Sequence, residues 1–439
     1  MITKVICWLA LFASLAVIFY FQGISNAYLI VGFAGLLISS ILLLLNKEAR
    51  INMFILLSSV IATLYILELF VGFVIHESFT PKEQRVNASK TLGIEYDMRE
   101  RDDIYKESKK QITLTVSPSN FIDHSKSGLI PLSPSKSKSY VINCNESGTY
   151  ATYMSDRFGF NNPDFVWDDN QVDWVVTGDS FINGSCVSEE DTLTYRLRLR
   201  NDSNSVLNVG ANGNGPLLEY AALKEYAYQK KPNKVIWVYY EGNDMANLNN
   251  EMKDKTLIKY FQEGFTQNIK GNQAIVDNMI QQYILSELND KNKQSSDFKK
   301  QLQWNTRYLR FYHLRNIIKK VILQSSASKK STINPKMFKI ISIVRDEIDR
   351  WGGELIFVYL PEHSRYSDIS INHDTFNNKK DVLLGIESLG IKFIDIHDEM
   401  FSQKQNPNEF FPFGLFGHYT EDAYNKISEI ISKKINNIK

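Results

Sequence analysis

The second half of the chain carries, at intervals, the residue types that acyl transfer needs. Ser180 ends a Gly-Asp-Ser tripeptide. A glycine-rich segment at 210–215, a Gly-Asn-Asp tripeptide at 242–244 and His418 follow it. A serine hydroxyl, an imidazole that can take its proton, and N–H donors for an oxyanion are the groups that cleave an ester through a tetrahedral intermediate. These spacings favour a serine-based acyl-transfer site.

Short apolar runs precede these polar segments, and helix-like segments separate the runs. The predicted strands are Trp174–Thr177, Val206–Val209, Val235–Tyr239, Leu355–Leu360 and Ile391–Ile394. Buried strands that alternate with helices are typical of a parallel sheet covered on both faces. Ligands bind beyond the carboxyl ends of such strands, where the polar segments begin. The sequence predicts an α/β three-layer sandwich with a parallel five-stranded, flavodoxin-like sheet.

These motifs carry a family resemblance. Over roughly residues 170–437 the chain resembles the SGNH (GDSL-type) hydrolase superfamily, because Ser180, Gly213, Asn243 and His418 occur in its order and spacing. The resemblance implies that Ser180 is the nucleophile and that His418 is the general base and then the acid. It also implies an oxyanion hole made by the backbone N–H groups of Ser180 and Gly213 and the side-chain amide of Asn243. Asp179 is expected to organise the nucleophile loop.

One position departs from the family pattern. An aspartate usually lies three residues before the histidine and orients the imidazole, but Leu415 occupies that position here. Either the site works as a Ser-His dyad, or another group takes this role. The candidates from the sequence are Asp398, Glu241 and Asp422, or a backbone carbonyl.

Composition excludes several partners and cofactors. The 439 residues carry a net charge of +1, which gives no reason to expect a nucleic-acid partner. The seven histidines and three cysteines show no metal-ligand spacing, and no phosphate-binding Gly-Lys loop is present, so neither a metal nor a cofactor is expected. Cys144 and Cys186 could form a disulfide or remain two free thiols.

The N-terminal region is strongly apolar. Three runs are near or above the length that crosses a bilayer as a helix, and they predict three transmembrane helices: Val5–Phe21, Tyr28–Leu45 and Met53–Ile75. Lys4, Lys47 and Arg50 place the N-terminus inside by the positive-inside rule. Everything after the third run is then on the extracytoplasmic side of the cytoplasmic (inner) membrane.

Three regions follow from these patterns. Residues 1–78 are expected to be the membrane anchor, and residues 79–168 an extracytoplasmic juxtamembrane segment with short strands at Gln111–Val116 and Tyr140–Asn143. Residues 169–439 are expected to be the SGNH hydrolase-like domain. A polar, helix-prone insertion at about 245–332 interrupts this domain, as a lid, a membrane-facing cap or a structural excursion.

The predicted function is an ester hydrolase or O-acyltransferase that acts through an acyl-serine intermediate, with hydrolysis and transfer both open. Analogy and location indicate acetyl groups of an extracytoplasmic polysaccharide as the substrate. A lipid esterase or lysophospholipase is an alternative that membrane proximity would suit. A catalytically silent carbohydrate-binding or assembly protein is another, because Leu415 replaces the expected acid. The expected partners are therefore an acylated carbohydrate or lipid and the membrane.

Overall fold

The computed structural model describes residues 2–21, 26–74, 80–108, 112–123, 128–201, 205–294, 311–315, 317–318, 333–367, 376 and 378–436. The chain divides into two compact units, each described here by itself. The first comprises Met1–Ser78 and Asp297–Ile322, and the second comprises Phe79–Ser296 and Leu323–Lys439.

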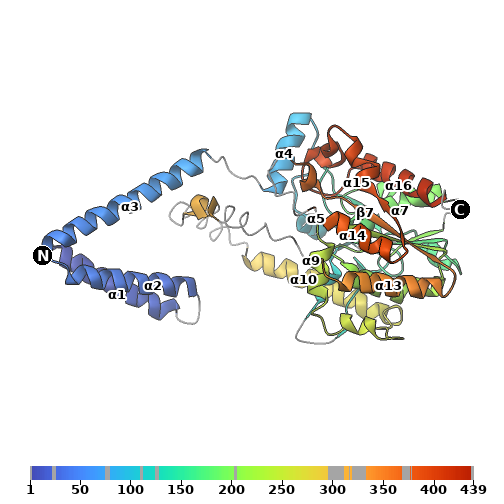
Figure 1. Cartoon of the computed structure of the whole chain (residues 1–439), viewed down its shortest axis with the longest axis horizontal. Coiled ribbons are helices and arrows are strands. Elements are labelled where there is room, and N and C mark those ends of the chain that lie inside the picture. Colours follow the sequence, from blue (N-terminus) through green and yellow to red (C-terminus); the bar gives the residue numbers. More distant parts are fainter. Residues whose placement is uncertain are drawn as a thin grey trace. The chain divides into compact units, whose positions relative to one another are not determined.

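The first unit contains three apolar helices, drawn in blue in Figure 1: α1 (Ile2–Phe21), α2 (Asn26–Leu44) and α3 (Lys47–Val74). Two stretches among the described residues are long and apolar enough to cross a membrane, Thr3–Tyr20 and Lys47–Gly72. The described apolar part of α2, Leu29–Leu44, is shorter. The predicted count of three spans is therefore corrected to two candidates, by length and composition alone, and a signal sequence would pass the same test.

The turn between α2 and α3 is held by one cation. Arg50 is buried, and its Nε donates to the carbonyl oxygen of Leu42 at 2.8 Å and its Nη2 to that of Leu45 at 2.5 Å. These carbonyls close α2 and have no partner within the helix. A cation at a helix C-terminus also complements the helix dipole. Arg50, which marked the loop by its charge, therefore also caps α2.

The second unit is built on a five-stranded sheet. Its strands are β4 (Trp174–Thr177), β5 (Val206–Asn208), β6 (Lys234–Tyr240), β7 (Glu354–Leu360) and β8 (Lys392–Asp395). The spatial order is β5-β4-β6-β7-β8, and every neighbouring pair is parallel. This is the doubly wound order in which the chain reverses direction beside the first strand. The predicted parallel five-stranded sheet is confirmed.

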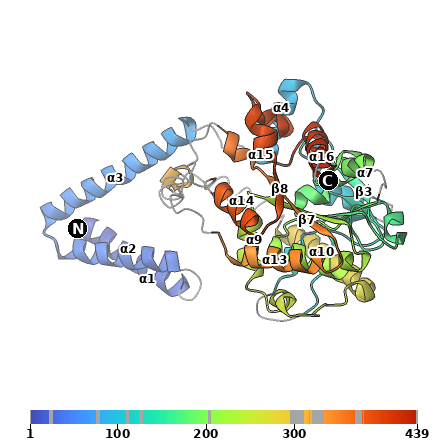
Figure 2. The same cartoon turned by 45° about the vertical axis from the view of Figure 1, so that its right-hand side comes forward.

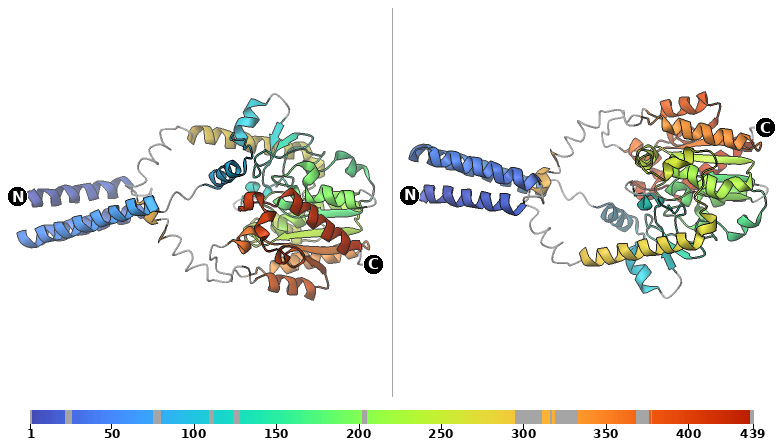
Figure 3. Two further views of the ribbon diagram at one scale, coloured as in Figure 1. Left: turned by 90° about the horizontal axis from the view of Figure 1, so that it is seen from above. Right: turned by 90° about the horizontal axis from the view of Figure 1, so that it is seen from below.

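Helices cover both faces of this sheet. On one face lie α7 (Leu193–Arg200) and α16 (Glu421–Asn436); on the other lie α8 (Pro216–Ala222), α13 (Lys336–Asp349) and α14 (Asn378–Ser388). Figure 2 shows α7 and α16 on the opposite side of β7 from α13, and the left view of Figure 3 shows the red α16 over the strands. The side chains of every residue in β4 are buried, as expected for a strand covered on both faces.

The segment before this sheet belongs to the same unit. It contains α4 (Pro81–Leu92), α5 (Arg101–Glu107) and a small sheet of β1 (Ile112–Leu114), β2 (Tyr140–Ile142) and β3 (Thr152–Met154). Strand β1 is parallel to β2, and β2 is antiparallel to β3. Leu114, Ile142 and Phe160 are buried in the same core as β4 and β6. The segment is therefore packed into the core of the large unit.

The first part of the predicted insertion also joins this core. It forms α9 (Asp244–Glu251) and α10 (Gln273–Gln294). Leu257, Tyr260 and Ile280 are fully buried against the core of the five-stranded sheet. This part is consequently a structural element of the unit. Residues 295–310, 316 and 319–332 of the predicted insertion lie outside the described residues.

Candidate active site

Ser180 is placed at the carboxyl end of β4 by a very short helix, α6 (Ser180–Asn183). Asp179 caps this helix: its Oδ1 accepts a hydrogen bond of 3.0 Å from the backbone N–H of Phe181. A side-chain acceptor at the N-cap satisfies a backbone donor that the helix itself leaves free. Asp179 therefore holds the backbone at the start of α6, next to Ser180.

His418 meets Ser180 from the other end of the chain. It lies just before α16, and its Nε2 is 2.9 Å from Oγ of Ser180. Its ring packs against that of Phe181, with 4.9 Å between centroids. This distance is within hydrogen-bond reach of a nucleophile by its base. The structure thus brings together two residues that the sequence separates by 238 positions.

The group beside the outer nitrogen of His418 is Glu146, which the sequence analysis missed. Its Oε2 is 3.3 Å from Nδ1 of His418 and accepts a 2.7 Å hydrogen bond from the backbone N–H of His418. A carboxylate that contacts both atoms fixes the ring orientation and favours the tautomer with a proton on Nδ1. Glu146 comes from the loop after β2, 272 residues earlier in the chain. Leu415, at the position where the family pattern has an aspartate, carries no acid.

Arg85 and Gly417 hold this carboxylate in place. Nη2 of Arg85, on α4, is 3.1 Å from Oε1 of Glu146 and donates to the carbonyl oxygen of Phe416 at 2.7 Å. The side chains of Arg85 and Glu146 are only 12% and 11% exposed, so water screens their attraction little. A Cβ at position 417 would collide with the carboxylate of Glu146. Glycine at this position therefore lets Glu146 reach the residue that follows.

A disulfide joins the segment of Glu146 to that of Ser180. Cys144 and Cys186 are bonded, with their Cα atoms 4.7 Å apart, so the pairing that the sequence left open is present. Sγ of Cys186 is 3.5 Å from Nδ1 of His418. These three residues are the one group in the described part of the chain with metal-ligand spacing. Because the two sulfurs are bonded to each other, neither is a thiolate that could hold a metal.

The electrostatics of the pair follow from this geometry. Burial opposes the charge of Glu146, yet the nearby His418 and Arg85 hold the pKa of its carboxyl below the ordinary value. Burial likewise disfavours protonated His418, but the carboxylate of Glu146 outweighs it and raises the pKa of the imidazole. The site therefore favours a charged His418–Glu146 pair, the state that forms when the imidazole accepts a proton from Ser180.

Gly213 and Asn243, the other predicted oxyanion donors, lie on the loops after β5 and β6. Gly213 has a φ of +68°, a left-handed conformation that favours glycine. Asparagine side chains tie these loops together: Nδ2 of Asn247 donates to the carbonyl oxygen of Gly213 at 3.2 Å. Nδ2 of Asn183 donates to Oδ1 of Asn212 at 2.9 Å, which ties the Gly213 loop to α6. Three strand-end loops are thus tied together, and the oxyanion roles remain a prediction.

A group of buried carboxyls lies behind these loops. Asp179, Glu219, Asp244 and Glu251 are all at most 1% exposed. Burial raises the pKa of each, to about 7 for Glu251, and the proximity of Asp179 and Glu251 raises that of Glu219 further. Glu251 accepts hydrogen bonds from three backbone N–H groups at the start of α8, which offset part of the cost of burying it. These carboxyls support the loops.

The acids proposed from the sequence as a third member lie in other ion pairs. Glu241 pairs with Arg365, Asp398 pairs with Lys379 at 2.7 Å, and Asp422 pairs with Lys426 at 2.5 Å along one face of α16. His363, a second histidine at a strand end, contacts the carbonyl oxygen of Gly414 through Nε2 at 3.0 Å. The sequence left the third role open to these acids, to a backbone carbonyl or to no group, and in the described residues the carboxylate beside His418 is that of Glu146.

One signal in the sequence could have led to Glu146. It lies two residues after Cys144, and a disulfide from Cys144 to Cys186 brings it within reach of the segment that begins at Ser180. The pairing alone would have limited the choice of acids to those near position 144. The spacing of the cysteines does not establish the bond, so the sequence alone does not lead to Glu146.

No protein-family model matches the chain, and a search of curated proteins finds no match. Solved structures do match. A lipase/acylhydrolase from Enterococcus faecalis is 13% identical, with a TM-score of 0.33, over 61% of this chain and 96% of that one. A GDSL-like lipase from Bacteroides thetaiotaomicron is 10% identical, with a TM-score of 0.32, over 60% and 87%. A lipolytic protein of the G-D-S-L family from Desulfitobacterium hafniense is 12% identical, with a TM-score of 0.31, over 60% and 99%. The chain is thus similar to GDSL-type lipolytic hydrolases and acylhydrolases.

Proposed function

We propose that the protein is a serine ester hydrolase or O-acyltransferase that works through an acyl intermediate on Ser180. The observation that carries this proposal is the contact series from Oγ of Ser180 to Nε2 of His418 and from Nδ1 of His418 to Glu146. A serine hydroxyl, a base in reach and a carboxylate that orients the base recur on unrelated folds as an acyl-transfer device. The catalytically silent alternative loses its main support, because an acid does face His418.

The chemistry follows from these contacts. Nε2 of His418 takes the proton of Ser180 as Oγ attacks the ester carbonyl carbon. The resulting oxyanion would accept hydrogen bonds from the backbone N–H groups of Ser180 and Gly213 and from the amide of Asn243. His418 then gives its proton to the alcohol oxygen as the carbon–oxygen bond breaks, leaving acyl-Ser180. Water or a second alcohol, deprotonated by His418, releases the acyl group as an acid or a new ester.

Location supports a substrate outside the cytoplasm. The disulfide between Cys144 and Cys186 would persist in an oxidising compartment, and disulfides are rare in cytosolic proteins. The apolar helices of the first unit would anchor the chain to a membrane or direct its export. An O-acetylated polysaccharide of the cell surface is the substrate class that we propose for this position. A membrane lipid is the alternative substrate.

A covalent probe tests the nucleophile directly. The full-length protein in detergent should react with a fluorophosphonate and hydrolyse p-nitrophenyl acetate, and Ser180→Ala should abolish both. Ser402→Ala is a matched control, because Ser402 is exposed and its Oγ bonds only a helix-end carbonyl. Persistent absence of labelling and of turnover in the folded wild-type protein would contradict the proposal. Rates on p-nitrophenyl esters of increasing chain length then separate the acetyl substrate from the long-chain lipid.

A further inference from the structure

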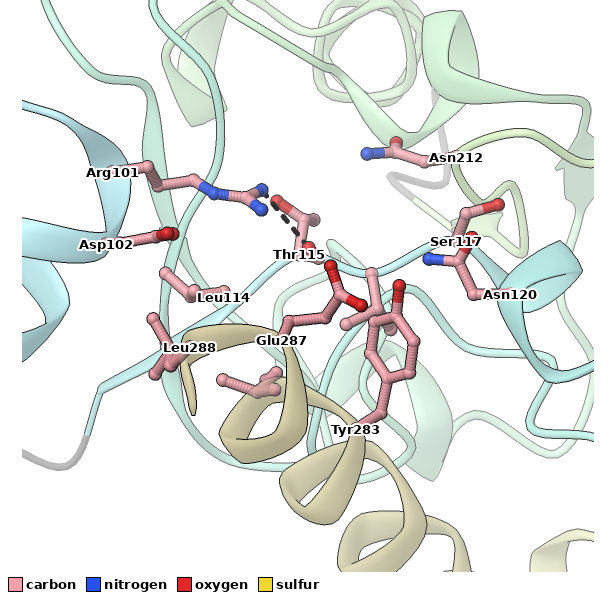
Figure 4. Close-up of a pocket in the computed structure, with 12 residues that line it drawn as sticks. Arg101, Asp102, Leu114, Thr115, Ser117, Asn120, Asn212, Tyr283, Glu287 and Leu288 are labelled. Carbon is pink, nitrogen blue, oxygen red and sulfur yellow. Dashed lines mark hydrogen bonds between the residues drawn. The ribbon is translucent and has the colours of Figure 1, made fainter. Parts of the chain in front are cut away.

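A cavity of about 250 Å³ lies beside the loop that carries Gly213. Its walls come from α5 and the segment after β1 on one side, α10 on the other, and the loop after β5 (Figure 4). Polar side chains on these walls include Arg101, Asp102, Ser117, Asn212 and Glu287.

Contacts connect this cavity to the candidate active site. Oδ1 of Asn212 accepts hydrogen bonds from Asn183 at 2.9 Å and from Ser185 at 2.8 Å, both just after Ser180. With Oδ1 engaged, its amide nitrogen is directed into the cavity, as Figure 4 shows. A Cβ on the adjacent Gly213 would lie 2.5 Å from Oγ of Ser117, which lines the cavity. The cavity wall therefore lies against the loop that carries Gly213. The cavity is therefore connected through Asn212 to the segment that begins at Ser180.

Arg101 provides a cation at the opposite wall. In Figure 4 its guanidinium and the amide nitrogen of Asn212 point toward one another across the cavity. Nη1 of Arg101 donates to the carbonyl oxygen of Thr115 at 3.2 Å, and none of the ion pairs among the described residues includes Arg101. Burial lowers the pKa of its guanidinium. A guanidinium has five N–H donors, so several remain for a ligand.

The charges in the cavity select the ligand. Asp102 and Glu287 also line it, so a phosphate or carboxylate that met Arg101 would also meet two negative groups. Hydroxyl groups both donate and accept, and suit a wall that offers both functions. The floor is formed by apolar side chains that can face C–H groups: Leu114, Val116, Ile284 and Leu288. The volume is below the usual range of about 300–1,000 Å³ for ligand pockets, which suits a single ring.

We propose that this cavity is the subsite for one neutral sugar ring of the substrate, bonded through its hydroxyl groups by Arg101, Asn212 and Glu287. This inference rests on the proposed function, because the ester that Ser180 attacks would be carried by that ring. The juxtamembrane segment and α10 would then supply the specificity of the site, in addition to the carboxylate of Glu146.

Selectivity between two esters tests the subsite. The full-length protein in detergent is assayed with glucose pentaacetate, which carries a ring, and with p-nitrophenyl acetate. Arg101→Met and Glu287→Gln should lower the ratio of kcat/KM for the sugar ester to that for the aryl ester by at least tenfold. Arg99→Met is the matched control, because Arg99 is exposed and pairs with Asp97; its ratio should stay within twofold of wild type. An unchanged ratio in both cavity variants, or an equal loss on both esters, would overturn the subsite.

A binding measurement separates this inference from the proposed function. Saturation-transfer NMR with methyl β-D-glucoside on the Ser180→Ala protein requires no turnover. We expect a signal that Arg101→Met and Glu287→Gln each reduce severalfold in that background and that Arg99→Met leaves unchanged. A wild-type protein that gives this signal but neither reacts with a fluorophosphonate nor cleaves either ester would refute the proposed function alone. A protein that cleaves p-nitrophenyl acetate but shows no sugar signal would refute the subsite alone.

Discussion

At the scale of single residues, the site depends on a carboxylate that no local sequence motif identifies. Glu146 contacts both the ring nitrogen and the backbone N–H of His418, and it is itself paired with Arg85. The ion pair with Arg85 matters because a carboxylate with few water contacts needs other partners to stay ionised. Side-chain contacts therefore link Arg85, Glu146, His418 and Ser180 in that order, and the four groups act as one electrostatic unit.

Replacing Glu146 by glutamine should lower kcat by about 10²–10⁴-fold, because the imidazole loses the group that fixes its tautomer and stabilises its charge. The pH profile supplies a second reading. His418 acts as a base only when it is neutral, so activity rises as pH passes its pKa. Because Glu146 raises the pKa of His418, the variant's acidic limb should move to lower pH. Kinetics with p-nitrophenyl acetate between pH 4 and 9 measure both effects.

The exposed Glu107 offers a control for this experiment, since Glu107→Gln removes a carboxylate whose ion pair with Arg99 lies at the surface. Its kcat and pH profile should match those of wild type. If Glu146→Gln kept kcat within threefold and left the acidic limb in place, the site would work as a Ser-His dyad. Glu146 would then have a structural role only.

Asn243 allows a separate prediction about the oxyanion. Its Oδ1 is buried without a hydrogen-bond partner among the described residues, while its side chain also stabilises ionised Asp179. Asn243→Ala should lower kcat by about 10²–10³-fold with little change in KM, because an oxyanion donor acts mainly in the transition state. Asn436→Ala, at the exposed end of α16, should leave both constants unchanged. A rise in KM at constant kcat would show that Asn243 binds the substrate in its ground state instead.

At the scale of elements, the disulfide joins two loops that no strand pairing connects. Cys144 follows β2, a strand of the small sheet. Cys186 follows α6, the short helix at the end of β4 in the large sheet. The bond therefore sets the separation between the loop of Glu146 and the loop of Ser180. A bridge that spans 42 positions also restricts the unfolded chain.

Removing this bridge should affect both stability and catalysis. The double variant Cys144→Ser and Cys186→Ser should lose about 2–4 kcal/mol of unfolding free energy. It should also lower kcat, because the loop of Glu146 is no longer held at His418. Combining it with Glu146→Gln should reduce kcat by less than the product of the two separate effects, since both act through the same contact. Normal kcat in the folded double variant would mean that the bridge serves stability alone.

The elements also show how far the sequence leads. Five apolar runs predicted the five strands and the edge at which Ser180, Gly213 and Asn243 lie, because buried parallel strands have a strong local signature. Glu146 and Arg85 could not be found in this way. They reach the site through long-range packing of α4 and the small sheet. No residue pattern around either of them predicts which residue it contacts. Leu415 at the expected position indicated that the acid was missing there, but it did not indicate which other residue supplies one.

At the scale of the whole molecule, the catalytic unit is larger than the region that resembles the hydrolase family. Residues 80–168 supply Arg85, Cys144 and Glu146 to the site, and they bury Leu114 and Phe160 in the shared core. Expressed alone, a 169–439 fragment should be poorly soluble and unreactive with a fluorophosphonate, since each buried large apolar side chain contributes about 1.5–3 kcal/mol. An 80–439 fragment should react like the full chain. Equal labelling of both fragments would contradict this view.

The last prediction concerns the side of the membrane on which this unit lies. Because the disulfide beside His418 persists in an oxidising compartment, a periplasmic-type phosphatase reporter fused after Lys439 should be active. A cytoplasmic reporter fused before Met1 should be active too only if all three apolar helices cross. If instead only the two long stretches cross, both termini share one side, and the N-terminal reporter should be silent. A C-terminal reporter that works only in the cytoplasm would contradict the extracytoplasmic location, because the bond between Cys144 and Cys186 would then lie in a reducing environment.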